Sequence, residues 1–288
     1  MYFIIKNIYT YIQKLSIYNQ TYIQLSHKNM KTALITGASN GIGLELAKIH
    51  ASKGDNLVLV ARNITALEAL KSTLEKQYQI KVYIIGKDLS APNAAQEVYN
   101  ETTKQHILVD YLINNAGFGD FGMFTETNWD KELQMINLNI TTLTHFTKLY
   151  LQEMVTRKSG KIMNVASTAA FQSGPQMAIY FATKAYVLSF SEAVNNEVSD
   201  KGVTITILCP GATESGFQAA AAMEDSALFK GRKLPTSKEV AEYGYKAMMK
   251  GKTVAIHGLM NNIMATAVRF FPRALIVKIT RKIQDKVS

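Results

Sequence analysis

Cysteine is almost absent from this chain of 288 residues, which contains only Cys209. A single thiol cannot form an intrachain disulfide or supply a cysteine cluster for zinc or an iron–sulfur centre. The five histidines show neither His-x3-His nor His-Glu spacing, so we expect no metal site. Internal repeats and low-complexity tracts are also missing, which excludes collagen-like and heptad-repeat proteins.

Acidic residues are scarce relative to basic ones. The chain has 22 Asp and Glu against 32 Lys and Arg, a net charge of +10. This balance favours anionic partners, such as phosphorylated cofactors, acyl-CoA, nucleic acid or a membrane surface, without selecting one of them. No recognition motif for nucleic acid is present, so we expect no nucleic-acid partner. Hydrophobic residues make up 47% of the chain, enough for a sizeable core.

Long apolar runs are also lacking. The longest uncharged run, residues 162–183, carries several polar side chains and a Gly174-Pro175 break. Lipid penalises unsatisfied polar groups, so this run is better interpreted as a strand that leads into a polar site. The first 29 residues contain no Asp, Glu or Arg and resemble neither a secretory signal nor an organellar presequence. We interpret residues 1–29 as a leader, which is either a real extension or an over-extended start with translation beginning at Met30.

From residue 30 onward, short apolar runs alternate with helical patterns. We predict strands at 33–36, 57–61, 82–85, 109–114, 161–166 and 203–209, and helices at 44–53, 64–78, 95–105, 129–156 and 180–198. Alternation of this kind implies right-handed crossovers and a parallel sheet that is covered on both faces. The predicted fold is a single doubly wound α/β domain (Rossmann fold) over residues 30–258.

Beyond Pro210 the pattern changes. Residues 216–235 form an apolar and polar mixture that we expect to be a substrate loop, with a short helix at 219–222. A further helix is expected to start after Thr236-Ser237. Residues 259–288 form a basic amphipathic tail, in which Leu275, Ile279 and Ile283 recur every four residues. Such a stripe can pack on the domain or on a second subunit, or it can lie in a membrane interface.

A glycine-rich turn follows the first predicted strand. Its residues are Gly37, Ser39, Asn40, Gly41, Ile42 and Gly43, with Gly-x3-Gly-x-Gly spacing. Glycines allow the backbone to approach a pyrophosphate, and the start of the next helix offers free N–H groups. The alternative is a plain strand-to-helix turn. The position of the glycine-rich turn directly after the first strand favours a dinucleotide site.

The second predicted strand ends at Ala61, and Arg62 follows it. Sites for NAD usually carry an acidic residue at this tip, whereas an arginine nearby can pair with the 2′-phosphate of NADP. A solvated surface arginine is the alternative interpretation. We predict NADP (NADPH) as the cofactor.

The spacing Tyr-x3-Lys occurs three times. Tyr2/Lys6 lies in the leader, and Tyr83/Lys87 lies on or just past a strand, where four residues span roughly 13 Å. Tyr180/Lys184 lies in a predicted helix, where positions i and i+4 are neighbours on one face. This pair is also preceded by Ser167 at the end of an apolar strand, so we predict that Tyr180, Lys184 and Ser167 form a catalytic set.

Together these motifs resemble the short-chain dehydrogenase/reductase family over residues 30–258. The stretch 170–192 looks most like an NADP-preferring, bacterial-type branch. The motifs that carry the resemblance are Gly37-x3-Gly41-Ile42-Gly43, Asp88-Leu89, Asn114-Asn115-Ala116-Gly117, Asn139, Ser167, Tyr180-x3-Lys184 and Pro210-Gly211.

The resemblance implies further roles. Asp88 would bind the adenine with Leu89 packed near it, and Asn115, Ala116 and Gly117 would lie beside the adenosine ribose. Pro210, Gly211, Thr213 and Ser215 would meet the nicotinamide amide. Tyr180 would transfer the proton, Ser167 would hold the reacting oxygen, and Asn139 would position a water that relays protons to Lys184. Lys184 would also bind the nicotinamide ribose and, together with the positive nicotinamide of NADP+, bring the pKa of Tyr180 down toward neutral pH.

The predicted function is that of an NADP(H)-dependent oxidoreductase that interconverts a carbonyl and a secondary alcohol. The alternative is an NADPH-sensing regulatory protein without turnover, which would have no need of Ser167, Tyr180 and Lys184. We expect a small, partly apolar substrate and a homodimer or homotetramer. The expected location is cytoplasmic. If the tail lies in a membrane interface, the protein would also contact a membrane peripherally.

Overall fold

The computed structural model describes residues 30–216 and 234–284. The leader, most of the predicted substrate loop with its helix at 219–222, and residues 285–288 lie outside the described residues. Contacts within the chain separate residues 1–31 from a second compact unit, Thr32–Ser288. The fold and the site described below belong to that second unit.

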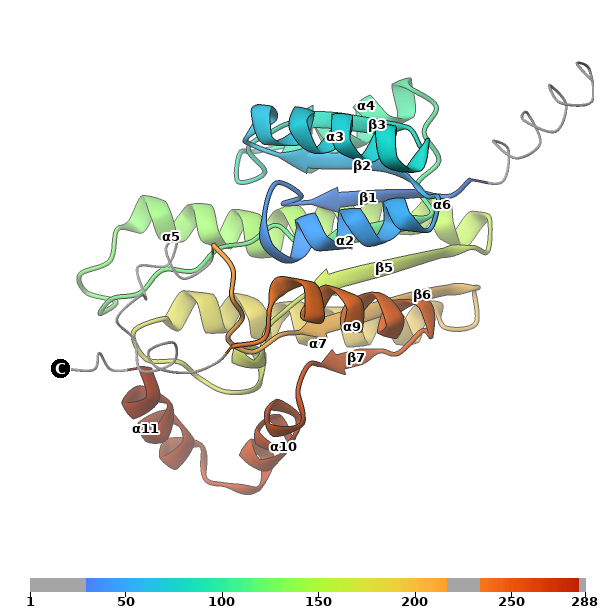
Figure 1. The fold of residues 1–288 in the computed structure, drawn as a ribbon. Helices are drawn as coiled ribbons and strands as arrows, with labels where there is room; N and C mark the ends of the chain where they lie inside the picture. The colour runs from blue at the N-terminus through green and yellow to red at the C-terminus, as the bar shows by residue number, and fades with distance from the viewer. Residues whose placement is uncertain (1–29, 217–233, 285–288) are drawn as a thin grey trace, which may run out of the picture. The chain divides into compact units, whose positions relative to one another are not determined.

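Seven parallel strands form one sheet in the order β3-β2-β1-β4-β5-β6-β7 (Figure 1). Their bounds are β1 Thr32–Thr36, β2 Asn56–Ala61, β3 Val82–Gly86, β4 Tyr111–Asn114, β5 Gly160–Val165, β6 Val203–Cys209 and β7 Val254–Ile256. All six predicted strands are confirmed. The sequence pattern missed β7, because three residues are too few to show a period; β7 pairs with the end of β6.

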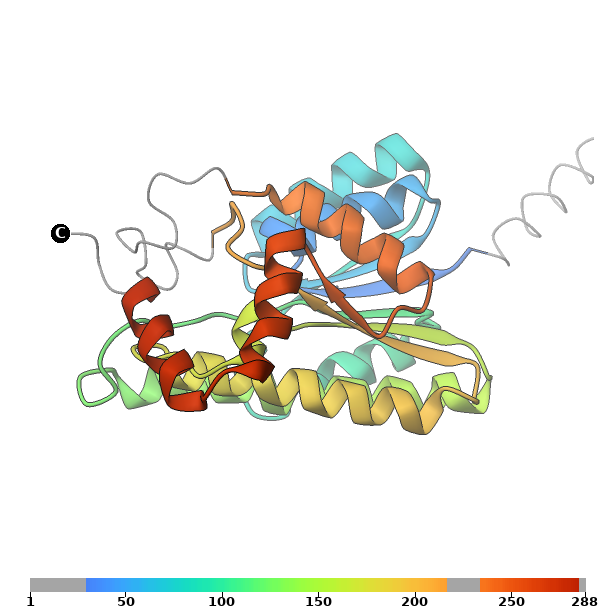
Figure 2. The same cartoon turned by 90° about the horizontal axis from the view of Figure 1, so that it is seen from below.

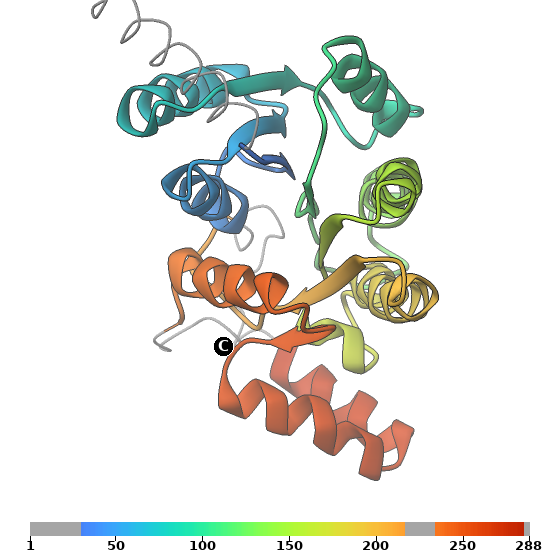
Figure 3. The same cartoon turned by 90° about the vertical axis from the view of Figure 1, so that its right-hand side faces the viewer.

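Helices cover both faces of this sheet, as predicted. Figure 3 shows α2, α3 and α9 on one face and α4, α6 and α7 on the other. The strands between them are apolar without alternation because both of their faces are buried; Ala33, Leu34 and Ile35 have no exposed surface. The bounds of these helices are α2 Gly41–Ser52, α3 Ile64–Tyr78, α4 Ala94–Lys104, α6 Leu143–Thr156, α7 Ala178–Val198 and α9 Ser237–Met249.

The predicted helix at 129–156 has the expected extent but not a uniform geometry. It consists of α5 (Trp129–Ile136), a π-helical segment η1 (Asn137–Thr142) and α6. Wider turns of this kind are frequent at functional sites. Asn139, a predicted site residue, lies within η1.

The sheet and its helices are joined by a buried polar network. Asn114 of β4 donates a hydrogen bond to Asn164 of β5 over 2.9 Å and one to Thr147 of α6 over 3.1 Å. Asn164 in turn donates to Ser191 of α7 over 2.8 Å. Each of these side chains is at most 3% exposed, so the network fixes how β4, β5, α6 and α7 pack together.

The strand order changes direction between β1 and β4, which are neighbours although they are not consecutive. From β1 the chain continues outward to β2 and β3, and from β4 it continues in the opposite direction to β5, β6 and β7. In doubly wound sheets, ligands bind at the carboxyl ends of the strands at such a point. The predicted site residues gather at this edge.

The chain continues past β7 into α10 (Leu259–Ala267), η3 (Val268–Phe270) and α11 (Arg273–Gln284). In Figures 1 and 2 these elements lie beyond the β7 edge of the sheet, with the two helices joined by a turn. A short 3-10 segment, η2 (Thr168–Phe171), follows β5 and contacts α10. Among residues 30–216 and 234–284, no helix has the length and apolar character that a membrane crossing requires.

Candidate active site

The turn after β1 requires glycine at three positions. Gly37 and Gly41 have φ of +66° and +55°, in the left-handed region that side chains disfavour. A Cβ atom on Gly37 would lie 2.9 Å from Asn115 Nδ2 and 3.0 Å from Ala116 Cα. A Cβ atom on Gly43 would overlap the Gly37 carbonyl. The predicted glycine turn is therefore packed against the residues that follow β4.

This turn leads into α2, whose first turn is not capped by a side chain within residues 30–216 and 234–284. Asn40, the residue that precedes α2, makes no capping hydrogen bond with its side chain, and the first turn of α2 contains no acidic residue. Its N–H groups and the positive end of the helix dipole are thus available to an anion. The glycines and this uncapped helix start fit a pyrophosphate group, with Ser39, Asn40 and Ile42 on the partly exposed rim.

Thr36 connects the ends of β1 and β4. Its hydroxyl accepts hydrogen bonds from the Asn115 and Ala116 N–H groups, both over 3.0 Å, and donates to the Ile113 carbonyl over 3.3 Å. The Asn115 amide donates back to the Thr36 carbonyl over 2.9 Å. Asn115 and Ala116 therefore act as a brace that fixes the glycine turn relative to β4.

The tips of β2 and β3 carry Arg62 and Asp88. Arg62 is exposed, immediately after the buried Ala61. Hydrogen bonds from the Ser90 N–H and hydroxyl lower the pKa of Asp88, and the nearby positive charge of Arg62 lowers it further, against a partial burial that raises it. Leu89 is buried, and its carbonyl accepts a hydrogen bond from Thr142 of η1 over 2.6 Å.

Ser167, Tyr180 and Lys184 meet at the end of β5. Ser167 caps the start of η2, where its hydroxyl oxygen accepts a hydrogen bond from the Ala169 N–H over 3.1 Å. Tyr180 and Lys184 lie one turn apart near the start of α7 and are 9% and 5% exposed. The Lys184 ammonium donates to the Val165 carbonyl over 2.8 Å and lies 5.7 Å from the centre of the Tyr180 ring.

Burial shifts the pKa values of the two ionisable side chains in opposite directions. It raises the pKa of Tyr180 to about 12, although a hydrogen bond with Ser167 acts to lower it. It lowers the pKa of Lys184 to about 8, because a charged ammonium loses its hydration there. The predicted lowering of the Tyr180 pKa concerns Lys184 acting together with the nicotinamide of NADP+, and it stays a prediction. The chain's own groups keep the phenol protonated, which is the form that donates a proton.

Asn139 and Gly117 lie beside Lys184. The Asn139 amide donates to the Phe118 carbonyl over 3.0 Å and to the Thr183 hydroxyl over 3.1 Å. A Cβ atom on Gly117 would come within 3.0 Å of Asn139 Oδ1 and 3.4 Å of Lys184 Nζ. Glycine at this position leaves room for both polar groups, and the π-helical turn of η1 places Asn139 next to them.

The residues after β6 close the other side of the site. The Pro210 carbonyl accepts a hydrogen bond from the Thr168 N–H over 2.9 Å, and Thr213, which is 7% exposed, donates to the Gly211 carbonyl over 2.9 Å. Ser215 lies next to the glycine turn, with its Cβ 3.5 Å from where a Cβ on Gly41 would stand. The structure thus brings all the predicted site residues to one edge of the sheet.

Two features of the site were missed at the level of sequence. Asn261 of α10 packs against Gly211, where an added Cβ would come within 2.5 Å of its amide. A small pocket next to Tyr180 is lined by acidic and amide side chains, including Asp120, Glu132 and Gln176. Neither feature belongs to a local motif, because the residues reach the site only through the packing of α5 and α10.

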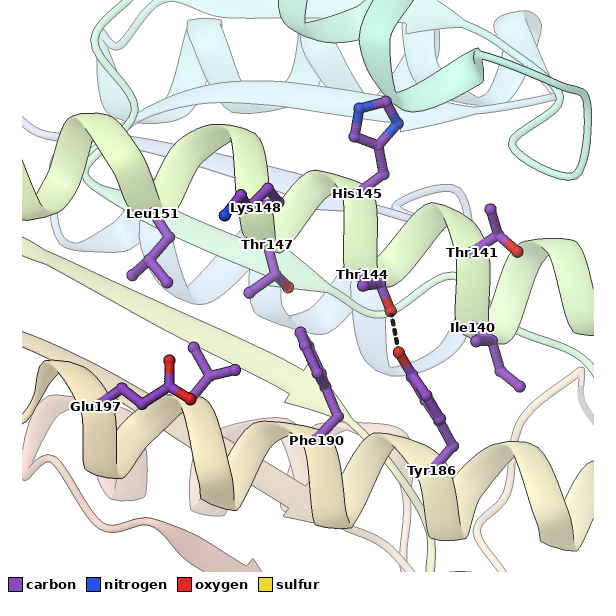
Figure 4. A pocket seen from close by; sticks show the side chains of 11 residues that line it. Ile140, Thr141, Thr144, His145, Thr147, Lys148, Leu151, Tyr186, Phe190 and Glu197 are labelled. Atoms are coloured by element: carbon purple, nitrogen blue, oxygen red, sulfur yellow. Dashed lines mark hydrogen bonds between the residues drawn. The ribbon is translucent and has the colours of Figure 1, made fainter.

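A larger groove lies elsewhere. It has a volume of about 570 Å³ and runs between α6 and α7 (Figure 4). Ser167, Tyr180 and Lys184 do not line it, so it is not the catalytic pocket. Its walls are mainly apolar, with Tyr186 stacked on Phe190 at a ring separation of 5.6 Å.

Comparison with known proteins agrees with this geometry. A family model described as short chain dehydrogenase matches residues 31–225. The chain belongs to the short-chain dehydrogenase family. A solved short-chain dehydrogenase from Sphingobium yanoikuyae in complex with NADPH superimposes with a TM-score of 0.77 at 29% identity, covering 86% of this chain and 95% of the other.

Two curated relatives show the range within the family. An NADP-dependent 3-hydroxy acid dehydrogenase from Schizosaccharomyces pombe is 29% identical over 241 residues, 81% of this chain and 92% of the relative. The human inactive hydroxysteroid dehydrogenase-like protein 1 is 33% identical over 180 residues. That alignment covers 62% of this chain, which spans only about half (54%) of the human protein. Since family relatives include a protein named inactive, membership alone does not establish turnover. Whether this chain turns over a substrate therefore depends on its site residues.

The low pKa of Lys184 predicts a change in how stability depends on pH. Between pH 8 and its ordinary value of 10.5, the unfolded chain holds the Lys184 proton more tightly than the folded chain does, so this group makes the free energy of unfolding rise with pH. Lys184→Met removes that contribution. The difference in unfolding free energy, wild type minus variant, should increase by about 1–3 kcal/mol over this range.

Denaturant unfolding of both proteins across that pH range measures the difference. Lys48→Met, which removes an exposed lysine from α2, serves as the control for losing one positive charge. A constant difference between wild type and Lys184→Met would show that Lys184 is solvated in the folded protein.

Proposed function

We propose that the protein is an NADP(H)-dependent oxidoreductase that interconverts a carbonyl group and a secondary alcohol. The observation that carries this proposal is the placing of Tyr180 and Ser167, which share a hydrogen bond, with Lys184 one helical turn away. These groups lie at the same sheet edge as the glycine turn and the uncapped start of α2. When bound, NADP supplies or accepts the hydride.

The chain's own residues handle the proton. Tyr180, kept protonated by burial, donates its proton to the carbonyl oxygen as the carbon accepts hydride, which gives a neutral alcohol. Ser167 holds the same oxygen by a hydrogen bond and so orients the carbonyl. The Lys184 cation stabilises the phenolate that remains on Tyr180 and then supplies the proton that restores the phenol. Asn139 beside Lys184 orients the water that replaces the proton Lys184 has given up.

Arg62 supports NADP as the preferred cofactor. Its exposed guanidinium at the tip of β2 replaces the acidic residue that would repel a 2′-phosphate. The Sphingobium yanoikuyae structure is an NADPH complex, and the Schizosaccharomyces pombe relative is named NADP-dependent. These neighbours favour the NADP-preferring branch of the family for this chain.

The surroundings of Tyr180 favour a substrate with an apolar part. Tyr180 packs in a cluster of buried or half-buried apolar side chains with Phe118, Phe121, Met177 and Phe181. Such walls desolvate an apolar group next to the reacting carbonyl. The relatives are named for hydroxy acids and hydroxysteroids, which share only a carbonyl or alcohol on a partly apolar frame.

A homo-oligomer is the second part of this proposal. The groove between α6 and α7 is apolar, and its rim carries Lys148 on α6 and Glu197 on α7. A two-fold interface uses the same surface on both subunits, so a patch with both signs of charge can complement itself. We infer that a second copy of the chain covers this groove.

Tyr180→Phe tests the proposed chemistry. Loss of the phenolic proton should lower turnover at least about 100-fold, the lower range of acid–base catalysis, while NADPH still binds. The measurement is NADPH oxidation across ketones, aldehydes, 3-oxoacyl thioesters and steroids. Tyr83→Phe, which belongs to a second Tyr-x3-Lys match on β3, is the matched control and should keep full activity.

Near-normal turnover of Tyr180→Phe would contradict the mechanism. Tight NADPH binding by the wild type without turnover of any substrate class would instead favour the NADPH-sensing regulatory protein.

Arg62→Ala tests the choice of cofactor. A charge-assisted contact with the 2′-phosphate contributes about 1.5–3 kcal/mol, so the dissociation constant for NADPH should rise at least about 10-fold. Binding of NADH should change little. Lys48→Ala, on the exposed surface of α2, controls for the loss of one positive charge. Equal losses for both cofactors would show that Arg62 does not bind the phosphate.

Tyr186→Glu tests the subunit contact. Tyr186 is 38% exposed at the groove, and a buried carboxylate there should dissociate the oligomer. Light scattering after size exclusion measures the molar mass. Met249→Glu on α9 is the matched control, because Met249 is 37% exposed and does not line the groove. Equal masses for the two variants would place the contact elsewhere.

A further inference from the structure

Exposed apolar side chains gather on α10, η3 and α11 (residues 259–284), which together form a C-terminal hairpin. Half of the large hydrophobic residues that are exposed in the described part of the chain lie in this one segment. A concentration of this kind marks an interaction surface, whereas single exposed apolar residues are ordinary. The members are Leu259, Met260, Ile263, Met264, Phe270, Phe271, Leu275 and Ile279.

The turn between the two helices carries two exposed aromatic side chains. Phe270 is 80% exposed and Phe271 52%, and Pro272 separates them from the start of α11. Figures 1 and 3 show this turn on the far side of the hairpin from the sheet. Phe270 and Phe271 at this turn, the tip of the hairpin, therefore do not contribute to the packing of the domain.

The amphipathic stripe of α11 faces the domain only in part, since Ile283 is half-buried. Thr280 and Gln284 are the buried residues of this helix. Leu275 and Ile279, which the sequence places on the apolar stripe, are 44% and 45% exposed. Packing onto its own domain therefore does not account for Leu275 and Ile279, and these two side chains need an external partner.

The charge of the hairpin selects the kind of partner. Residues 259–284 contain Arg269, Arg273, Lys278, Arg281 and Lys282 and no acidic residue. A second copy of the chain would bring the same positive charges face to face across a two-fold axis, which is unfavourable. An anionic lipid surface attracts each of these side chains, and aromatic residues flanked by arginine fit its headgroup layer.

We propose that the C-terminal hairpin binds the anionic surface of a lipid bilayer, with Phe270 and Phe271 inserted at the headgroup level. The hairpin lies on the surface and does not cross the bilayer, since neither α10 nor α11 is long enough to do so. Leu275 and Ile279 face the acyl boundary, and Lys278 and Lys282 reach the lipid phosphates by extending their flexible stems.

The hairpin is also coupled to the catalytic edge of the sheet. Asn261 of α10 packs against Gly211, and the Arg281 guanidinium of α11 lies 3.8 Å from the Met123 sulfur, which precedes α5. The hairpin proposed to bind the bilayer therefore contacts the same edge of the sheet as the site. The proposal does not depend on the proposed function, because lipid binding is measured without a cofactor or a substrate.

A tryptophan reporter tests insertion of the tip. Trp129 is the only tryptophan of the chain, so the double variant Trp129→Phe/Phe270→Trp carries its single indole at the tip. Its emission should shift to shorter wavelength with phosphatidylcholine–phosphatidylserine vesicles and not with phosphatidylcholine alone. Trp129→Phe/Leu108→Trp is the matched control, since Leu108 is 55% exposed outside the hairpin, and its emission should not shift.

Co-sedimentation with the same vesicles tests the charge. Lys278→Gln/Lys282→Gln should lower the partition coefficient about 30-fold, because each basic residue near an anionic surface contributes roughly fivefold. Lys104→Gln/Lys201→Gln, an exposed pair outside the hairpin, should retain the wild-type partition coefficient. Melting temperatures and molar masses of all variants are measured alongside, so that misfolding is distinguished from loss of binding.

Three results would overturn the proposal. The first is the absence of a shift in the Phe270→Trp reporter, and the second is equal sedimentation of both lysine pairs. The third is a lower molar mass of Lys278→Gln/Lys282→Gln with unchanged vesicle binding, which would make the hairpin a subunit contact.

Discussion

The hydrogen bonds between Thr36 and the Asn115-Ala116 backbone hold the two central strands together at the edge where the strand order reverses. On one side of this junction, the glycine turn and α2 form an anion site. On the other side, Gly117 leaves space for Asn139 and Lys184. Neither half of the site could keep its position if β1 and β4 shifted against each other, so the junction is the constraint that the remaining contacts depend on.

Burial determines the protonation of the catalytic groups. Tyr180 and Lys184 are one helical turn apart in the same apolar surroundings, yet desolvation raises the pKa of the phenol and lowers that of the ammonium. Both shifts favour the neutral form of the group. Below pH 8 this leaves a protonated phenol beside a cationic ammonium. The arrangement suits reduction of a carbonyl, in which the protein must give up a proton.

Most of the fold could be predicted from the sequence because its signals are local. The apolar strands, the glycine turn and Tyr180-x3-Lys184 each lie within a few residues. What escaped prediction depends on long-range packing. The three residues of β7 become a strand only by pairing with β6, and Asn261 reaches Gly211 only through the position of α10. The π-helical turn at Asn139 accompanies contacts with Phe118 and Thr183 that no helical period encodes.

The uncapped start of α2 sets a limit on how far the protein can be stabilised. A carboxylate introduced into the first turn of this helix would neutralise its dipole and lengthen the life of the folded chain. The same charge would repel the pyrophosphate that the N–H groups are free to bind. Selection for thermal robustness and selection for cofactor affinity thus act in opposite directions at Asn40 and its neighbours. Variants selected for stability alone would therefore gain stability and lose affinity for the cofactor.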